Sequence, residues 1–382
     1  MKLIGVLGAG AMGSGIAQVA LSHGHPVILV DNDAAALDRA KTNMRHAIQR
    51  EIEKGRVKPD AAAYSLEAAQ HLDALKPAGL VIEAIVERIE AKHAAFRALS
   101  NIVADDCVLA TNTSSLSIAS IASGASKPER VLGVHFFNPA PVLPLVEIVP
   151  WLGTADHVTG ETKALVDSWR KTTVIASDTP GFIVNRVARS YYGEALRMAD
   201  EGIADFRTID AAMRELGGFR MGPFELMDFI GLDVNLAVTK SVFEALGFDP
   251  RYRPSLTQQR LVDAGRLGRK TKQGFYDYRQ GPLEPEPLID HALGERIFDR
   301  ILSMLINEAI DAVHWRVASP ADIDLAVTKG VNYPKGLLAW GDERGLDHVL
   351  EALMALQEEY GEDRYRPSAL LRRMVRDGGR FT

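Results

Sequence analysis

The stretch Lys2-Leu3-Ile4-Gly5-Val6-Leu7-Gly8-Ala9-Gly10-Ala11-Met12-Gly13 decides the fold of this chain. Its first half is an apolar run that predicts a strand, and residues 14–20 continue in a pattern that predicts a helix. Glycines spaced as G-x-G-x-x-G at such a junction allow a tight turn and the close approach of a pyrophosphate, whose charge the helix N-terminus favours. The stretch therefore predicts a dinucleotide site formed by Gly8, Gly10, Ala11, Met12 and Gly13.

A second predicted strand, His25-Pro26-Val27-Ile28-Leu29-Val30-Asp31, ends in a carboxylate. An acid at this distance from the glycines accepts hydrogen bonds from the adenosine ribose and repels a 2′-phosphate, so Asp31 favours NAD over NADP. The alternative for the N-terminus is a signal peptide or a membrane span, because residues 3–22 carry no charge. Glycines, serine and glutamine interrupt that run and favour the dinucleotide site.

The composition limits the classes of function. At 382 residues, 47% hydrophobic and 25% charged, the chain has the composition of a globular protein with two or three domains. A net charge of −6 without a run of Lys or Arg predicts no nucleic-acid partner, and no membrane partner is predicted. The one cysteine, Cys107, predicts a buried thiol in a reducing compartment, the cytoplasm. The ten histidines show no metal-ligand spacing, so no metal site is predicted.

Apolar runs and helical patterns alternate up to about residue 178. Strands are expected at residues 79–84, 107–111, 131–135, 145–149 and 173–176, with helices at residues 34–53 and 87–103 among others. This alternation predicts an α/β Rossmann-type NAD-binding domain over residues 1–178, with a mainly parallel sheet and helices on both faces. Beyond Asp178-Thr179-Pro180-Gly181 helical periodicity dominates, which predicts an all-α domain over residues 179–282.

The helical pattern is repeated after a proline-rich linker at residues 279–287. Glu194-Ala195 recurs as Glu308-Ala309, and Gly231-Leu232-Asp233 as Gly345-Leu346-Asp347, both displaced by 114 positions. Such recurrence at one offset predicts duplicated all-α domains, the second copy lying at residues 288–382. Asn185 aligns with Asp299 in that copy, so we expect the second copy to be degenerate, with the fold kept and the site lost.

Polar residues follow two of the predicted strands, and a carboxylate lies inside a third. Thr111-Asn112-Thr113-Ser114-Ser115 and His135-Phe136-Phe137-Asn138-Pro139 come at strand ends, where open α/β sheets bind ligands. Glu147 stands in the apolar strand Leu145-Val146-Glu147-Ile148-Val149, where an unpaired carboxylate is unfavourable. Its predicted partner is His135, so that Glu147 fixes one ring nitrogen and the other nitrogen acts as a base.

This pair suits the oxidation of an alcohol by NAD, because the hydroxyl proton must leave as hydride is transferred. Ser114 is predicted to hydrogen-bond the reacting oxygen, and Asn185 to hold it or a neighbouring carbonyl. The alternative is that each of these residues has only a structural role. His135 would then be a core histidine, and Glu147 would face water. Ser114 would cap a helix near Ser117, and Asn185 would cap a helix or face solvent. The dinucleotide pattern upstream favours the catalytic interpretation of the four residues together.

Over residues 1 to about 278 the chain resembles the 3-hydroxyacyl-CoA dehydrogenase family. The blocks that carry the resemblance are residues 8–15 with Asp31, Val81-Ile82-Glu83-Ala84-Ile85-Val86-Glu87, Asn112-Thr113-Ser114-Ser115, His135-Phe136-Phe137-Asn138-Pro139-Ala140-Pro141, Glu147, Asp178-Thr179-Pro180-Gly181-Phe182-Ile183-Val184-Asn185-Arg186, Met221-Gly222-Pro223-Phe224-Glu225-Leu226 and Gly274-Phe275-Tyr276. The duplicated tail, with Gly330-Val331-Asn332-Tyr333-Pro334, looks like that of longer bacterial members that oxidise 3-hydroxyadipyl-CoA in phenylacetate catabolism.

The resemblance implies a catalytic set of His135, Glu147, Ser114 and Asn185, with the last two contacting substrate and nicotinamide. It also implies NAD contacts at Glu87, Lys92, Asn138 and Lys270, an acyl-CoA substrate, and a substrate and dimerisation role for the first helical domain. A CoA-phosphate contact is implied on the helix after the second strand. Our candidate there is Lys54, with a solvated lysine at a helix end as the alternative.

Two positions depart from the family pattern. The family usually has Lys-Thr-Gly-x-Gly-Phe-Tyr where this chain has Lys270-Thr271-Lys272-Gln273-Gly274-Phe275-Tyr276, so Lys272 replaces a glycine. Ala47 stands where some members direct a serine towards CoA. Both departures concern affinity for cofactor and CoA and leave the predicted chemistry unchanged.

The function predicted from these residues is oxidation of an (S)-3-hydroxyacyl-CoA to the 3-oxoacyl-CoA, with 3-hydroxyadipyl-CoA or 3-hydroxybutyryl-CoA of fatty-acid metabolism as substrate. The alternatives are a gulonate-type dehydrogenase of a free hydroxy or sugar acid, and a non-catalytic NAD-binding protein. Arg186, Arg189 and Arg220 are candidates for binding a distal carboxylate, and each could instead be a surface residue. For the oligomeric state, the second helical copy either substitutes for a partner subunit or extends a homodimer interface.

Overall fold

The computed structural model describes residues 2–55, 65–279, 281 and 287–381 of the chain. These residues divide into two compact units, Met1–Thr179 and Pro180–Thr382, which are described separately below. We call the first the nucleotide unit and the second the helical unit. In the described part of the chain, no helix combines the length and the apolar character needed to cross a bilayer.

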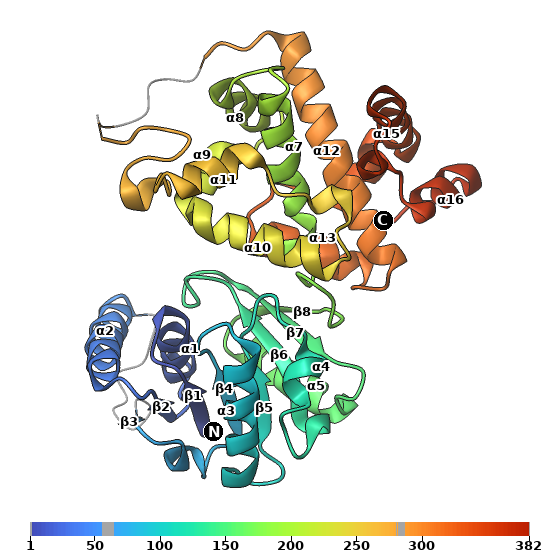
Figure 1. The fold of residues 1–382 in the computed structure, drawn as a ribbon. Coiled ribbons are helices and arrows are strands. Elements are labelled where there is room, and N and C mark those ends of the chain that lie inside the picture. Colours follow the sequence, from blue (N-terminus) through green and yellow to red (C-terminus); the bar gives the residue numbers. More distant parts are fainter. Residues whose placement is uncertain (1, 56–64, 280, 282–286, 382) are drawn as a thin grey trace. The chain divides into compact units, whose positions relative to one another are not determined.

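The nucleotide unit is built on one eight-stranded sheet (Figure 1). Its strands, in the order β3-β2-β1-β4-β5-β6-β7-β8, are Leu66–Ala69, Val27–Val30, Ile4–Leu7, Leu80–Glu83, Val108–Thr111, Val131–Phe136, Leu145–Pro150 and Thr172–Ile175. Neighbouring strands pair in parallel except β6 and β7, which are antiparallel. The mainly parallel sheet predicted from the sequence is confirmed, with β7 and β8 running against the others.

Every expected strand forms within two residues of its predicted limits, but β3 was missed. Its sequence, Leu66-Glu67-Ala68-Ala69, contains no β-branched or aromatic residue, and Ala and Glu are depleted in strands. Hydrogen bonding to β2 stabilises the extended conformation, which the residues of β3 do not favour on their own. This strand forms because the edge of β2 is available to it, which is a tertiary effect.

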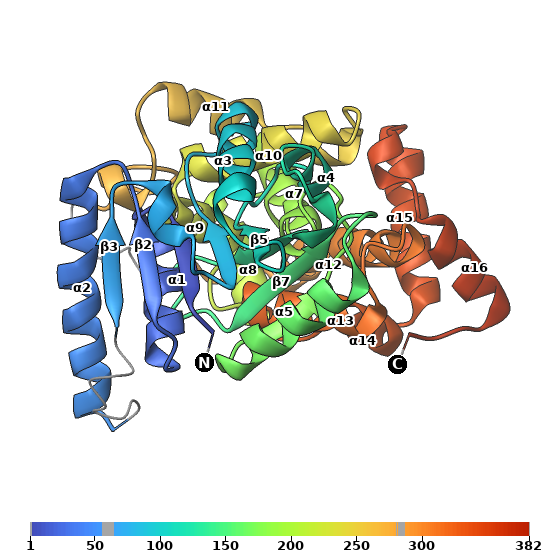
Figure 2. The same cartoon turned by 90° about the horizontal axis from the view of Figure 1, so that it is seen from below.

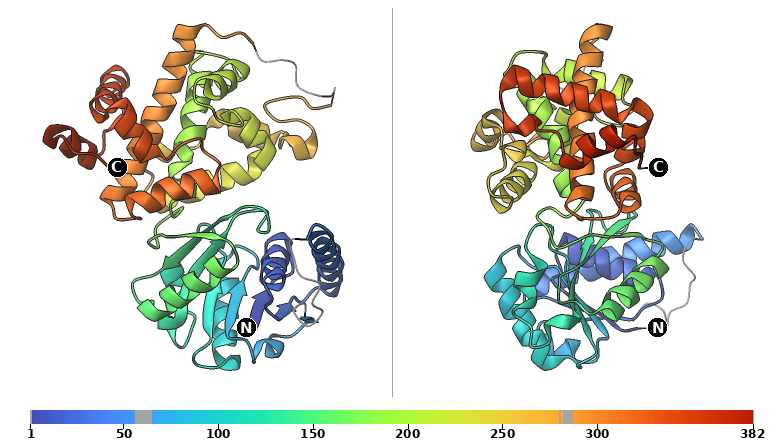
Figure 3. Two further views of the ribbon diagram at one scale, coloured as in Figure 1. Left: turned by 180° about the vertical axis from the view of Figure 1, so that it is seen from behind. Right: turned by 90° about the vertical axis from the view of Figure 1, so that its right-hand side faces the viewer.

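Helices cover both faces of the sheet (Figures 2 and 3). On one face, α1 (Ala11–Ser22), α2 (Ala34–Glu53) and α5 (Asp156–Ser168) pack onto a core that includes Ile16, Met44 and Val166. On the other, η2 (Leu72–Leu75), α3 (Ile89–Ile102) and α4 (Ile118–Ala122) pack onto a core that includes Phe96 and Leu109. A short turn of helix, η3 (Pro128–Arg130), precedes β6. The predicted helix at residues 34–53 is confirmed without a change of limits.

The helical unit contains two series of elements in the same order. The first is α6 (Val184–Val187), α7 (Arg189–Asp200), α8 (Phe206–Glu215), α9 (Pro223–Ile230), α10 (Leu232–Ala245), η4 (Pro250–Tyr252), α11 (Leu256–Asp263) and η5 (Arg269–Thr271). The second is α12 (His291–His314), α13 (Pro320–Gly330), α14 (Leu337–Arg344), α15 (Leu346–Tyr360), η6 (Asp363–Tyr365) and α16 (Ala369–Asp377). Helix α12 runs beside α7 (Figure 1), so the two series pack on each other.

Two buried ion clusters join the series. In one, Glu308 accepts hydrogen bonds from Arg186 Nε at 2.6 Å, from Arg251 Nη1 at 3.3 Å and from Tyr252 at 2.5 Å. In the other cluster, Glu194 accepts hydrogen bonds from Arg300, Arg364 and Tyr365 at 2.7–2.8 Å. These three donors stand 113 or 114 positions after the three donors to Glu308, so the second cluster repeats the pattern of the first. Each glutamate therefore binds at least one arginine from the other series.

The division of the helical part into two copies stays a prediction, and the paired clusters support it. A second similarity between the two series also supports the division. Asp210 accepts hydrogen bonds from the N–H groups that begin α9, and Asp324 accepts from those of Leu338 and Ala339 in α14. The predicted linker at residues 279–287 lies largely outside the described residues.

Replacing Glu308 with alanine should destabilise the helical unit by roughly 3 kcal/mol, because the buried guanidinium groups of Arg186 and Arg251 lose one carboxylate and keep that of Asp311. The measurement is the free energy of unfolding from guanidinium titration of the variant and of wild type. The control is Glu351→Ala, which removes an exposed carboxylate on α15. Equal stability of the two variants would contradict the prediction.

Candidate active site

The glycine-rich turn between β1 and α1 has the form of a phosphate cradle. Gly8 has φ +108°, and a Cβ on Gly13 would lie 1.8 Å from the carbonyl oxygen of Gly8, so both positions require glycine. Helix α1 begins after Gly10 without a side-chain cap, and no atom of the described residues lies within 4 Å of where a Cβ of Gly10 would be. Open space before uncapped N–H groups at a helix N-terminus fits a pyrophosphate.

Asp31 lies beside this turn at the end of β2. Its Oδ2 accepts a hydrogen bond from the N–H of Ala9 at 2.6 Å, and Oδ1 accepts from that of Asp33 at 2.9 Å. The carboxylate therefore helps to hold the glycine turn. It remains partly exposed at the strand's carboxyl end, where the ribose of a dinucleotide binds in this type of fold.

His135 and Glu147 face each other across the antiparallel pair β6–β7. Nδ1 of His135 lies 2.7 Å from Oε2 of Glu147. Glu147 is fully buried and His135 is 5% exposed, so the low polarity around the pair strengthens this contact. The predicted pairing of His135 with Glu147 is present in the structure.

Ser114 lies in the turn after β5, where Glu87 organises the backbone. Oε1 of Glu87 accepts hydrogen bonds from the N–H of Ser114 at 3.1 Å and from the hydroxyl of Thr113. Ser117, and not Ser114, caps α4, which removes the structural interpretation given for Ser114 above. Burial raises the pKa of Glu87, but Lys92 and Thr113 outweigh it and lower that pKa below its usual value.

Lys92 is buried beneath this turn. Its ammonium group lies 2.7 Å from Glu83 and 3.1 Å from Glu87, and only 1% of its side chain is exposed. Glu83 is fully buried and also accepts hydrogen bonds from Thr111 Oγ1 at 2.7 Å and from the N–H of Ile85. Lys92 thus stabilises two carboxylates, one at the end of β4 and one in the connection from β4 to α3, while its direct contact with NAD stays a prediction.

Three residues at this edge were not assigned a role from the sequence. Asn112 Oδ1 accepts from the N–H of Phe136 at 2.8 Å and so joins the ends of β5 and β6. Asp178 accepts from the N–H groups of Ile118 and Ala119 at the start of α4. Glu83 anchors Lys92. A carboxylate in an apolar strand was the available signal for Glu83, as it was for Glu147.

The remaining predicted contacts with cofactor or substrate follow the end of β6 or lie in the helical unit. Asn138 is exposed, just beyond β6. In the helical unit, Asn185 is partly buried in α6, and Lys270 pairs with Asp233 at 2.5 Å. Lys272 has φ +57°, a left-handed conformation that favours the glycine usual in the family. The roles of Asn138, Asn185 and Lys270 in binding stay predictions.

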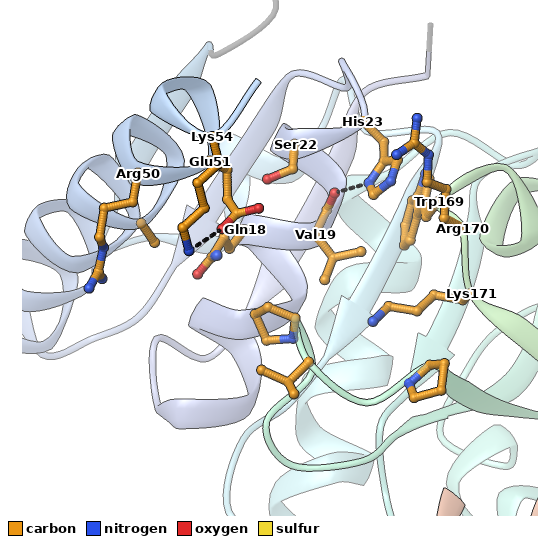
Figure 4. Close-up of a pocket in the computed structure, with 14 residues that line it drawn as sticks. Gln18, Val19, Ser22, His23, Arg50, Glu51, Lys54, Trp169, Arg170 and Lys171 are labelled. Atoms are coloured by element: carbon orange, nitrogen blue, oxygen red, sulfur yellow. Dashed lines mark hydrogen bonds and ion pairs between the residues drawn. The ribbon is translucent and has the colours of Figure 1, made fainter. Parts of the chain in front are cut away.

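A pocket of about 640 Å³ opens beside α1, α2 and the connection between β6 and β7 (Figure 4). The lining includes four lysine and arginine residues, Arg50, Lys54, Arg170 and Lys171. Lys54 follows the last turn of α2, with its side chain 56% exposed and 3.5 Å from Glu51. Ala47 also lines the pocket. The basic lining suits an anionic ligand.

A mainly parallel sheet with this turn and with a His–Glu pair at its edge defines an NAD-binding dehydrogenase. The profile described as "3-hydroxyacyl-CoA dehydrogenase, NAD binding domain" matches residues 3–179. The profile "3-hydroxyacyl-CoA dehydrogenase, C-terminal domain" matches residues 181–278 and 297–381. The chain belongs to the 3-hydroxyacyl-CoA dehydrogenase family, and it is an NAD-dependent enzyme of that family.

Individual relatives agree with this assignment. The chain is 40% identical to a 3-hydroxyadipyl-CoA dehydrogenase of Escherichia coli K12, over 97% of each sequence. It is 39% identical to a 3-hydroxybutyryl-CoA dehydrogenase of Bradyrhizobium diazoefficiens, over 73% of this chain and 96% of the relative. A crystal structure of 3-hydroxybutyryl-CoA dehydrogenase from Escherichia coli K12 matches with a TM-score of 0.93 and 38% identity, over 98% of both chains.

Replacing Lys92 with methionine should destabilise the nucleotide unit by roughly 3–5 kcal/mol, because Glu83 stays buried without its cation. The measurement is urea unfolding of the variant, with Lys76→Met, which alters an exposed lysine, as control. Adding Glu83→Gln to Lys92→Met should recover part of the loss, because the uncompensated charge is removed. A double variant no more stable than Lys92→Met would argue against this account.

Proposed function

We propose that the enzyme oxidises the 3-hydroxyl of (S)-3-hydroxyacyl-CoA with His135 as the base, and that the reaction runs in reverse with NADH. The observation that carries the assignment of residues is the 2.7 Å contact of His135 with the buried Glu147 at the carboxyl edge of a dinucleotide-binding sheet. His135 exchanges a proton with substrate, and Glu147 keeps the ring in one tautomer and stabilises the imidazolium.

Bound NAD supplies the hydride acceptor. Proton transfer is assigned to Nε2, because Nδ1 of His135 contacts Glu147. In the oxidation, Nε2 takes the proton of the 3-hydroxyl group, and in the reduction it returns that proton to the 3-oxo oxygen. Ser114 holds the reacting oxygen from a turn that Glu87 fixes. Asn185 binds the same oxygen or the thioester carbonyl.

The CoA moiety is proposed to bind at the pocket beside α1 and α2. Lys54 and Arg50 contribute positive charge there, and Lys54 is the proposed phosphate contact. Ala47 offers no hydroxyl at this wall, so the affinity for CoA depends on the basic residues. We propose that the enzyme lies in the cytoplasm, where a buried free thiol such as that of Cys107 stays reduced.

The acyl group is proposed to be a short chain, in line with the names of the relatives. Among the three candidate arginines for a distal carboxylate, Arg186 is engaged by Glu308. Arg189 is buried and donates to the carbonyl oxygens of Asn185 and Asn235, and Arg220 is exposed. Arg186 is therefore the weakest of the three candidates, because its charge is already compensated.

The test is NADH consumption with acetoacetyl-CoA, 3-oxoadipyl-CoA and free acetoacetate. We expect turnover of the CoA esters and a kcat/KM for free acetoacetate that is lower by several orders of magnitude, because the CoA binding energy is absent. Equal kcat/KM with free acetoacetate would indicate a hydroxy-acid dehydrogenase. Saturable NADH binding without turnover of any CoA ester would indicate a non-catalytic protein.

His135→Gln should bind NADH as wild type does and should lose roughly 10²–10⁴-fold in kcat, because general base catalysis is removed. Glutamine keeps the size and a hydrogen bond to Glu147 without accepting a proton. NADH binding is followed by fluorescence titration, and turnover by NADH absorbance with acetoacetyl-CoA. A variant with kcat close to that of wild type would exclude His135 as the base.

A further inference from the structure

Lys171 is a half-buried cation that donates hydrogen bonds to backbone carbonyls. It follows α5 at the start of β8, and its ammonium group donates to the carbonyl oxygens of Ala140 at 2.5 Å and Leu143 at 2.8 Å. Both acceptors belong to the connection between β6 and β7, residues 137–144, which we call the dyad loop. Figure 4 shows the Lys171 side chain at the wall of the pocket that this loop also lines.

The dyad loop joins the two strands that carry His135 and Glu147. Strand pairing ends at Phe136 opposite Val146, so the His135–Glu147 pair lies one position from the end of the ladder. Strand ends open locally at low free-energy cost unless other contacts hold them. The geometry of the catalytic pair therefore depends on what fixes the dyad loop.

The loop is held from two sides. On one side it lies against α1, where a Cβ on Gly15 would come within 3.2 Å of both Ala140 Cβ and Pro141 Cδ. On the other side Lys171 donates to two of its carbonyls, and the N–H of Thr172 donates to Pro144 at 2.8 Å. Lys171 supplies the side-chain contacts on this second side.

A charged amine at the position of Lys171 is unfavourable, so we infer that its contacts with the dyad loop have a functional role. No carboxylate of the described residues forms an ion pair with Lys171, and burial lowers the pKa of its amine to about 8. His23 and Arg170 are nearby titratable or charged groups of the pocket, and neither offsets the charge. Arg170 has φ +55°, so the turn that delivers Lys171 also contains a strained residue.

We propose that Lys171 is a positioning residue for the dehydrogenase reaction, which clamps the dyad loop and so holds His135 against Glu147. The inference rests on the proposed function of that pair. Lys171 acts through the loop, so it should affect turnover of any 3-oxoacyl thioester. A residue that only bound the CoA nucleotide would affect KM for complete CoA esters alone.

The experiment compares Lys171→Met with wild type on acetoacetyl-CoA and on acetoacetyl-pantetheine, which lacks the nucleotide. We expect kcat to fall by about tenfold or more with both substrates, because small misplacement of reacting groups is costly, while the Kd for NADH stays unchanged. Lys171→Arg, which keeps a cation and several donors, should recover part of kcat. Lys76→Met is the control for loss of an exposed lysine in the same unit.

Lys54→Met is the comparison for direct binding, and it should raise KM for acetoacetyl-CoA without changing kcat for acetoacetyl-pantetheine. If Lys171→Met behaves like Lys54→Met, or like wild type, the positioning role is wrong. If Lys171→Met does not fold, the inference is judged on Lys171→Gln, whose shorter and uncharged side chain also lacks the contacts of the ammonium group. An unchanged kcat of that variant with both substrates would overturn the inference. Wild type inactive on both substrates would instead refute the proposed function.

Discussion

The structure of the proposed catalytic centre depends on one buried contact, the 2.7 Å interaction of Glu147 with His135. A carboxylate with no exposed surface must be hydrogen-bonded or paired, and the antiparallel register of β6 and β7 places the imidazole directly opposite it. A shift of β7 by one residue would turn Glu147 to the face of the sheet opposite His135. The reversal of strand direction at β7 therefore creates the pair, because it brings Glu147 to the edge where β1, β4 and β5 end.

Much of this edge could be predicted from the sequence, because local patterns are sufficient for it. The glycine turn, Asp31 and the strand limits follow from spacing and apolar runs, and Glu147 stands out as a charge in an apolar strand. Contacts between distant segments could not be predicted in the same way. Lys92 lies in an ordinary helical pattern, and only the fold shows that it is buried between two glutamates. The short strand β3 needed its neighbour β2 to form.

The helical unit shows the same division between pattern and partner. Recurring residues at displacements of 114 and 113 predict two similar series of helices. The pattern does not say that Glu308 binds Arg186, or that Glu194 binds Arg300, because each pair joins residues more than 100 positions apart. Buried ion pairs require specific geometry to offset desolvation. The two series are thus matched to each other in charge as well as in apolar surface.

Lys92, which is buried, and Lys171, which is half-buried, are stabilised in different ways within one unit. Lys92 has two carboxylates, so its position is fixed by strong electrostatics and it holds the turn that carries Ser114. Lys171 has two carbonyl oxygens, which stabilise a charge less well and leave the pKa of its amine near 8. Carbonyls, unlike side-chain carboxylates, belong to the backbone itself, so contacts with them restrain the path of the chain. A lysine bound in that way is suited to holding a loop, and this loop is the one that joins the two strands of the catalytic pair.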